Sequence, residues 1–279
     1  MSALSAESLR VDYGDKPVIE DLSLQIASQS FTAIIGPNGC GKSTLLKTFA
    51  RVIRPSAGQV LLEGERVNSM RSRAVARRMS LLPQSPIAPD GITVRDLVAR
   101  GRHPHHTLLR QWSHEDERAI DDALDRTGLT ELASRRVAAL SGGQRQRAWV
   151  AMVLAQDTQI ILLDEPTTFL DIAHQYELLE LCMQLNREGR TIVVVLHDLN
   201  QAARFASELV VLREGRIWQT GSPAEVMRER MLREVFGLSA EVVPDPLTGT
   251  PMVVPRPAGS TPQRTAARDH APGQCEQAQ

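Results

Sequence analysis

Apolar and polar positions along the chain follow two different periods, which predicts a fold built from both strands and helices. Residues 31–35, 160–163 and 192–196 form short, nearly continuous apolar runs. Strands buried on both faces show this pattern, because helices cover both sides of a parallel sheet. Residues 9–13 and 22–26 alternate instead between apolar and polar side chains, as half-buried strands do. The pattern predicts an α/β fold with a mixed sheet and an N-terminal antiparallel β subdomain.

Helical signals dominate the middle of the chain. Thr93 and Ser113 each begin a capping-box pattern, with an aspartate three residues later. Gly101 and Gly128 stand where glycines commonly end helices. These signals predict a helical subdomain, at about residues 88–158, inserted into the α/β core.

The C-terminal half returns to alternating helices and strands. The apolar segment 148–155 predicts a buried helix, and Gly189 is expected to end a second helix over about residues 174–188. Glu214 and Gly215 form a hairpin signal between two short strands. This alternation is typical of a core in which helices connect parallel strands.

The composition indicates one domain followed by a tail. Residues 256–279 are rich in Pro, Ala, Gln, Gly and charged side chains and show no periodicity, so we expect this tail to be disordered. Residues 1–255 are long enough for one large core with a subdomain. We therefore predict a single domain over that range.

Charge and cysteine content restrict the possible settings. The chain has 32 Lys and Arg against 33 Asp and Glu, a formal net charge of -1, so nothing global favours nucleic acid as a partner. Three scattered cysteines are too few for a disulfide framework, which indicates a reducing compartment. No apolar run approaches the roughly 18 residues needed to span a bilayer.

The strongest local signal is the segment GPNGCGKS at residues 36–43, which fits the phosphate-binding pattern G-x-x-x-x-G-K-[ST]. It follows an apolar strand and opens a helix, so backbone N–H groups and the helix N-terminus can surround phosphate. Lys42 is expected to neutralise the β- and γ-phosphates, and the Ser43 hydroxyl to take a Mg²⁺ coordination position. The predicted nucleotide contacts here are Gly36, Pro37, Asn38, Gly39, Cys40, Gly41, Lys42, Ser43 and Thr44.

Cys40 occupies a free position of this loop. We interpret it as a small filler rather than a redox switch, although a thiol at a helix N-terminus is often readily alkylated.

Polar residues end three further predicted strands. Asp164 and Glu165 follow the run 160–163, and neighbouring residues of a strand point in opposite directions. We expect Asp164 to hold Mg²⁺ through water and Glu165 to polarise the water that attacks the γ-phosphate. His197 is interpreted as a γ-phosphate sensor, and Gln84 as a residue that reaches Mg²⁺ or the water. Each of these residues alone would more often be structural.

A second Gly-rich segment, LSGGQ at residues 140–144, precedes another helix and offers a second anion-binding site. An ordinary loop with an N-cap is the alternative explanation. Because one nucleotide site needs only the other two motifs, we infer that the chain holds half of a shared site and works as a dimer. The predicted contacts from this segment are Ser141, Gly142, Gly143 and Gln144.

An early tyrosine and a group of histidines each allow a functional and a structural interpretation. Tyr13 lies at the end of an early strand, where it either stacks on adenine or packs on the surface. His103, His105 and His106 lack a carboxylate or cysteine at ligand spacing, and Pro104 interrupts any helix, so we do not expect them to bind a metal.

Taken together, these motifs resemble the ATP-binding subunit of ABC transporters over roughly residues 5–255. In that resemblance the segment 36–43 corresponds to Walker A, Gln84 to the Q-loop, residues 140–144 to the signature, Asp164 and Glu165 to Walker B, Asp171 to the D-loop, His197 to the switch histidine and Tyr13 to the adenine-stacking aromatic. Phe169 departs from the small residue that most members carry before the Leu-Asp pair. The resemblance implies the fold of an ABC ATPase with a P-loop NTPase core, and hydrolysis of ATP with Mg²⁺.

Within that family, residues 91–105, 144–152 and 196–202 are similar to the ATPases of ferric-siderophore importers, and residues 245–251 to the ferric-enterobactin type. This similarity implies a homodimer of ATPase subunits on the cytoplasmic face of the cell membrane, bound to integral-membrane permease subunits and indirectly served by a substrate-binding protein. An importer of vitamin B12 or haem is the alternative. A chromosome-structuring ATPase is disfavoured, because no sustained heptads separate the first and third motifs.

Overall fold

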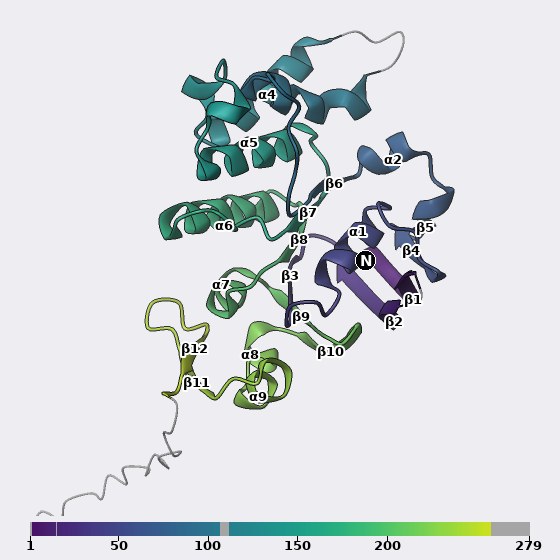
Figure 1. Ribbon diagram of the computed structural model, residues 1–279, viewed down its shortest axis with the longest axis vertical. Helices are drawn as coiled ribbons and strands as arrows, with labels where there is room; N and C mark the ends of the chain where they lie inside the picture. Colours follow the sequence, from purple (N-terminus) through teal and green to yellow (C-terminus); the bar gives the residue numbers. More distant parts are fainter. Residues whose placement is uncertain (1, 15, 107–111, 258–279) are drawn as a thin grey trace, which may run out of the picture.

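A six-stranded sheet in the order β10-β9-β3-β8-β7-β6 forms the centre of the protein (Figure 1). The computed structural model describes residues 2–14, 16–106 and 112–257. The strands are β3 (Phe31–Ile35), β6 (Met79–Leu82), β7 (Ile160–Asp164), β8 (Thr191–Val195), β9 (Glu208–Arg213) and β10 (Arg216–Gly221). Five of them pair in parallel, and β10 joins β9 as the predicted antiparallel hairpin. The mixed sheet is therefore confirmed.

Side chains of the central strands point alternately into two hydrophobic clusters. In β8, Ile192 and Val194 join the cluster formed with the helices α5 (Gly142–Ala155), α6 (Ile172–Arg187) and α7 (Leu199–Phe205). Val193 and Val195 join the second cluster, which includes the helix α1 (Lys42–Phe49) and the N-terminal sheet. All five residues of β8 are buried, as the continuous apolar run predicts.

The N-terminal sheet is antiparallel, in the order β2-β1-β4-β5. Its long first hairpin covers the predicted strands and extends beyond them. Two strands and two short helices after the glycine loop had no clear sequence signal. The elements here are β1 (Ser2–Tyr13), β2 (Lys16–Ala27), α1 (Lys42–Phe49), β4 (Ala57–Leu62), β5 (Glu65–Arg66), η1 (Val67–Ser69) and α2 (Ser72–Ala76).

Helices fill the middle of the chain and gather at one end of the molecule (Figure 1). They are α3 (Val94–Ala99), η2 (Arg100–His105), α4 (His114–Arg126), η3 (Thr130–Leu132), η4 (Val137–Ala139) and α5 (Gly142–Ala155). Ser113 forms the predicted capping box of α4, and Thr93 caps α3 by accepting a hydrogen bond from the backbone N–H of Asp96. Gly128 follows α4 with a left-handed φ of 62°, as predicted.

Gly101 follows the end of α3 as predicted, because α3 ends at Ala99 with Arg100 as its C-cap. Its backbone is not left-handed, however, and the chain continues directly into η2. A Cβ at Gly101 would lie 2.2 Å from the backbone oxygen of Met152 in α5. Gly101 is therefore required by the close approach of two backbones rather than by a left-handed turn.

The C-terminal third adds helices to one face of the sheet and ends in a hairpin. Its elements are α6 (Ile172–Arg187), α7 (Leu199–Phe205), α8 (Pro223–Val226), α9 (Glu229–Phe236), β11 (Ala240–Pro244) and β12 (Pro251–Pro255). Gly189 follows α6 with a φ of 95°, as predicted. Nearly all of the tail predicted to be disordered lies outside the described residues. Every helix in the described ranges is too short or too polar to traverse a lipid bilayer.

One buried ion pair fixes the helical region. Arg102 and Asp116 are 2% and 1% exposed at their side chains, and Arg102 Nε donates to Asp116 Oδ1 at 2.8 Å. Arg102 also donates to the backbone oxygen of Ala155, and Ser113 donates to Asp116 Oδ2. Burial alone would raise the pKa of Asp116, but the hydrogen bonds from Arg102 and Ser113 hold it well below its usual range.

We predict that Asp116→Ala lowers the free energy of unfolding by about 3–5 kcal/mol, because it leaves the Arg102 guanidinium buried without its partner. Urea denaturation at pH 7 measures the change. The pKa of Asp116 is lower in the folded state, so its contribution is complete at neutral pH and is lost as the pH falls below about 4. The gap between wild type and variant should therefore narrow in acid.

The matched control is Asp122→Ala, on the same helix. Asp122 pairs with Arg126 at 2.9 Å on the surface, so its loss should cost less than about 1 kcal/mol. Equal losses in the two variants would contradict the role given to the buried pair.

Candidate functional site

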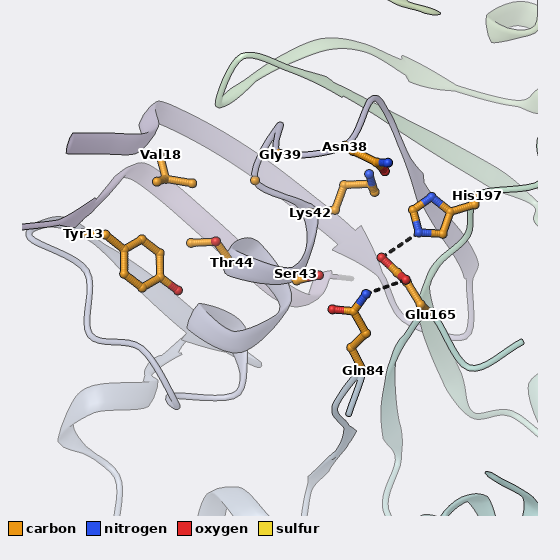
Figure 2. Close-up of a pocket in the computed structure, with 11 residues that line it drawn as sticks. Tyr13, Val18, Asn38, Gly39, Lys42, Ser43, Thr44, Gln84, Glu165 and His197 are labelled. Atoms are coloured by element: carbon orange, nitrogen blue, oxygen red, sulfur yellow. Dashed lines mark hydrogen bonds and ion pairs between the residues drawn. The ribbon is translucent and has the colours of Figure 1, made fainter. Parts of the chain in front are cut away.

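A cavity of 480 Å³ lies at the edge of the sheet where the parallel strands end (Figure 2). It brings together residues that are far apart in the sequence. Its lining consists of Tyr13, Val18, Asn38, Gly39, Gly41, Lys42, Ser43, Thr44, Gln84, Glu165 and His197. Ten of these eleven residues are among those predicted for the nucleotide site, and Val18 is the exception.

The glycine loop between β3 and α1 follows a path that only glycine allows at two positions. A Cβ at Gly36 would lie 2.2 Å from the backbone oxygen of Leu212 in β9. Gly41 caps α1 with a φ of 106°, and a Cβ there would lie 3.2 Å from the backbone oxygen of Val18. The backbones of β9 and β2 thus lie so close to the loop that only glycine fits at these two positions, and the resulting turn directs the N-terminus of α1 toward the cavity.

Lys42 folds back over this loop. Its Nζ donates to the backbone oxygens of Gly36 and Pro37, at 2.8 and 2.9 Å, and the residue is only 5% exposed. The ammonium group is thus fixed inside the loop, at the N-terminus of α1. A fixed cation at a helix N-terminus is suited to bind phosphate oxygens.

Asp164 and Ser43 form a second polar group beside Lys42. Ser43 Oγ donates to Asp164 Oδ1 at 2.7 Å, while Asp164 Oδ2 is buried without a hydrogen-bond partner among the described residues. Burial raises the pKa of Asp164, and the hydrogen bond from Ser43 acts in the opposite direction. A buried, unpaired carboxylate oxygen next to a serine hydroxyl fits a hard divalent cation such as Mg²⁺.

Glu165 lies between two residues from neighbouring strand ends. Its Oε2 accepts a hydrogen bond from Gln84 Nε2 at 2.6 Å, and its Oε1 lies 2.6 Å from His197 Nε2 (Figure 2). The backbone of Glu165 is left-handed, with φ 52°, a conformation that costs a non-glycine residue about 1–2 kcal/mol. Such strain is common where a catalytic group must be aimed.

Tyr13 and Val18 line the far end of the cavity from Glu165 (Figure 2). Tyr13 is 54% exposed and presents its ring to the open side. Val18 was missed by the sequence analysis, because an isolated valine carries no chemical signal. Its place follows from β2, which passes over Gly41.

The Gly-rich segment at residues 140–144 does not line this cavity. Ser141 caps α5 in a reciprocal capping box with Gln144, which leaves the first backbone N–H groups of the helix, including those of Gly142 and Gly143, without helical acceptors. A separate cavity of 310 Å³ lies beside it, lined by Gln84, Ser85, Pro86, Gly142, Arg145, Gln146, Trp149 and Phe169. Within one chain, the two predicted anion-binding segments therefore form two different surfaces.

Asp171 and Cys40 also lie outside the main cavity. Asp171 is the exposed N-cap of α6 and accepts from the backbone and ring of His174, which lowers its pKa. Cys40 is buried, and its thiol pKa is raised by that burial. It is a filler, as predicted, but the expected ready alkylation does not fit a buried thiol with a raised pKa.

Two of the histidines near the end of η2 lie close to polar atoms of other segments, although His106 Nε2 forms no hydrogen bond among the described residues. His105 Nε2 lies 2.8 Å from the backbone oxygen of Gln156, and His106 Nε2 lies 3.4 Å from Asp116 Oδ2. Within the described residues, no three His, Cys, Asp or Glu side chains lie close enough together to hold a metal ion.

Comparisons with known proteins agree with this geometry. The sequence profile of the family described as ABC transporter matches residues 19–168. The chain is 53% identical to the ferric enterobactin transport ATP-binding protein FepC of Escherichia coli (strain K12), covering 94% of this chain and 97% of that protein. It is 49% identical to the petrobactin import ATP-binding protein FpuD of Bacillus anthracis, covering 95% and 97%.

A solved structure shows the same architecture. The dimeric structure of MJ0796, a bacterial ABC transporter cassette, matches with a TM-score of 0.72 and 26% identity, over 78% of this chain and 98% of that one. The family profile covers more than half of the sequence, and the relatives are similar over almost their whole length. The chain therefore belongs to the ABC transporter family.

Proposed function

We propose that this chain is the ATP-hydrolysing subunit that powers import of ferric siderophores through a membrane permease. The observation that carries the proposal is Glu165, held between Gln84 and His197 at the edge where Lys42 lies. The relatives named for ferric enterobactin transport and petrobactin import support the substrate class. Their identities of 53% and 49% extend over almost the whole chain, including the segments that resemble siderophore importers.

The chemistry follows from the positions of the lining residues. Tyr13 stacks on adenine, Lys42 neutralises the β- and γ-phosphates, and Glu165 accepts a proton from the attacking water. His197 and Gln84 hold the carboxylate of Glu165 and contact the γ-phosphate and the water. Ser43, with Asp164 and Gln84 through water, would hold Mg²⁺, which neutralises charge on the phosphates.

The site is completed by a second copy of the chain. Ser141, Gly143 and Gln144 of one copy face Lys42 and Glu165 of the other, with ATP between them. This arrangement is supported by the separation of the two anion-binding segments within one chain and by the dimeric relative. Binding of two ATP molecules closes the head-to-tail dimer and hydrolysis reopens it. Asp171 and the exposed Phe169 lie at this interface between the two copies.

The permease contacts the segment after Gln84, which contributes Ser85 and Pro86 to the cavity of 310 Å³. This cavity joins the segment after Gln84 to α5, so a helix seated there contacts both the main site and the signature segment. The permease should therefore change ATP turnover, and nucleotide should change the permease. We further propose that residues 1–255 form one ABC ATPase domain with the helical subdomain at 88–158, on the cytoplasmic face of the membrane.

The substrate class is tested by transport. A strain that lacks this chain should lose uptake of radioiron-loaded siderophore and regain it with the wild-type gene but not with a Lys42→Ala copy. Supplying cobalamin and haem in parallel separates the alternatives. Normal siderophore uptake in the deletion strain, with loss of cobalamin or haem uptake, would overturn the siderophore assignment.

We predict that Glu165→Gln retains ATP binding and loses at least about 100-fold in turnover, because the amide no longer accepts the proton of the attacking water. Phosphate release measures turnover, and equilibrium nucleotide binding measures affinity. Steady hydrolysis by this variant would remove Glu165 from its role.

A mixing experiment tests the shared site. Ser141→Arg and Lys42→Ala copies should each be inactive alone, whereas an equimolar mixture should recover roughly a quarter of wild-type activity. Random pairing makes half of the dimers mixed, and each mixed dimer contains one intact site. An inactive mixture, together with wild-type turnover per molecule that is unchanged on dilution, would contradict the dimer.

A further inference from the structure

The segment LHDLNQA at residues 196–202 contains polar side chains that the proposed chemistry does not use. Asp198 caps α7, because its Oδ1 accepts from the backbone N–H groups of Asn200 and Gln201 at 2.8 and 2.9 Å. Asp198 alone therefore provides the side-chain cap of α7, and the side-chain amides of Asn200 and Gln201 form hydrogen bonds with other elements. His197 lies immediately before this capped turn, so the position of α7 determines where the imidazole stands.

Asn200 fastens α7 to the C-terminal hairpin. Its Oδ1 accepts from the backbone N–H of Val253 at 2.7 Å, and its Nδ2 donates to the backbone oxygen of Val253 at 3.3 Å. One side-chain amide thereby satisfies both backbone groups of a residue in β12. Arg204, four residues later, lies 3.8 Å from Asp245 at the turn of the same hairpin.

Gln201 connects α7 with α6 and with the loop after Glu165. It is only 3% exposed, and its Nε2 donates to Gln175 Oε1 at 2.7 Å. Gln175 Nε2 in turn donates to the backbone oxygen of Leu170 at 3.1 Å. A buried amide that loses its partner is strongly disfavoured, so the two side chains hold each other and the loop in one arrangement.

The hydrogen bonds from Gln201 to Gln175 and from Gln175 to Leu170 form a relay between α7 and the loop 166–171. The Leu170 end of this relay packs against the signature segment. Leu170 is 7% exposed, and its Cδ2 would lie 3.3 Å from a Cβ placed on Gly143. The next residue, Asp171, is the N-cap of α6, the helix that carries Gln175. The relay therefore joins the loop of His197 to the loop 166–171 and, through packing, to the N-terminus of α5.

We propose that Gln201 and Gln175 are positioning residues for ATP hydrolysis, and that Asn200 anchors α7, the helix of Gln201, to the β11–β12 hairpin. This inference rests on the proposed function, since the residues are positioned for ATP hydrolysis. Catalytic side chains must be held to within about 0.5 Å of their productive geometry, which requires supporting residues of this kind. The relay makes the segments after β7 and β8 a single rigid unit. The C-terminal hairpin contributes no residue to the lining of the cavity, but it is part of that unit through its hydrogen bonds with Asn200.

The test uses full-length Gln201→Met, Gln175→Met and the double variant, since methionine matches glutamine in length but carries no amide. Each single variant should lose about fivefold in kcat for ATP, with KM changed less than about twofold, as expected for one lost hydrogen bond. The double variant should lose no more than either single one, because both changes break the same relay. Gln184→Met is the matched control and should leave kcat unchanged. Gln184 lies on α6 with Gln175, but its side chain is exposed and its amide donates to Glu188 instead.

Amide hydrogen exchange gives a readout that does not need hydrolysis. Gln201→Met should speed exchange about fivefold in both residues 166–171 and 197–205, whereas Gln184→Met should not. Asn200→Ala should speed exchange in residues 240–255 and in 197–205.

Unchanged kcat and exchange in Gln201→Met, or losses that multiply in the double variant, would overturn the relay. A lower unfolding temperature with unchanged kcat would likewise reduce these residues to a structural role. A wild-type chain that hydrolyses no ATP would instead refute the proposed function, and the exchange data would then decide the relay alone.

Discussion

The parallel pairing of β3, β8, β7 and β6 is the constraint on which the rest of the site depends. Parallel strands end on the same side of a sheet, so the segments that follow them meet at one edge. Asp164 pairs with Val195, which places Glu165 and His197 just beyond adjacent strand ends. A shift of one residue would turn every side chain of the shifted strand to the opposite face of the sheet, and the packing of the two hydrophobic clusters opposes such a shift.

Rigid surroundings also explain how a strained residue persists. The left-handed backbone of Glu165 is unfavourable by itself, and it is retained because the neighbouring segments fix it. Gln84 and His197 occupy its two carboxylate oxygens from either side. Each of these partners follows a different strand, so the orientation of one carboxylate depends on the alignment of three.

The sequence was most informative where chemistry and local structure share one segment. The loop 36–43 was predictable because its glycines, its lysine and the flanking strand and helix are contiguous. Features that arise from packing between distant segments were not predictable. Val18 reaches the cavity because β2 passes over the loop, and the requirement for Gly101 comes from the backbone of α5. The hairpin held by Asn200 had no signal, since a side-chain amide gives no indication of its partner.

The burial of two cysteines has a practical consequence for measuring motion in this protein. Burial raises the pKa of Cys40, and it raises the pKa of Cys182 to about 12, so little thiolate is present at neutral pH at either position. Maleimides and disulfide reagents should therefore bypass both residues and label cysteines introduced on the surface. The third cysteine, Cys275, lies outside the described residues, so replacing it removes any contribution of that thiol to the labelling. Spectroscopic probes at the proposed subunit seam then become feasible without altering the phosphate loop.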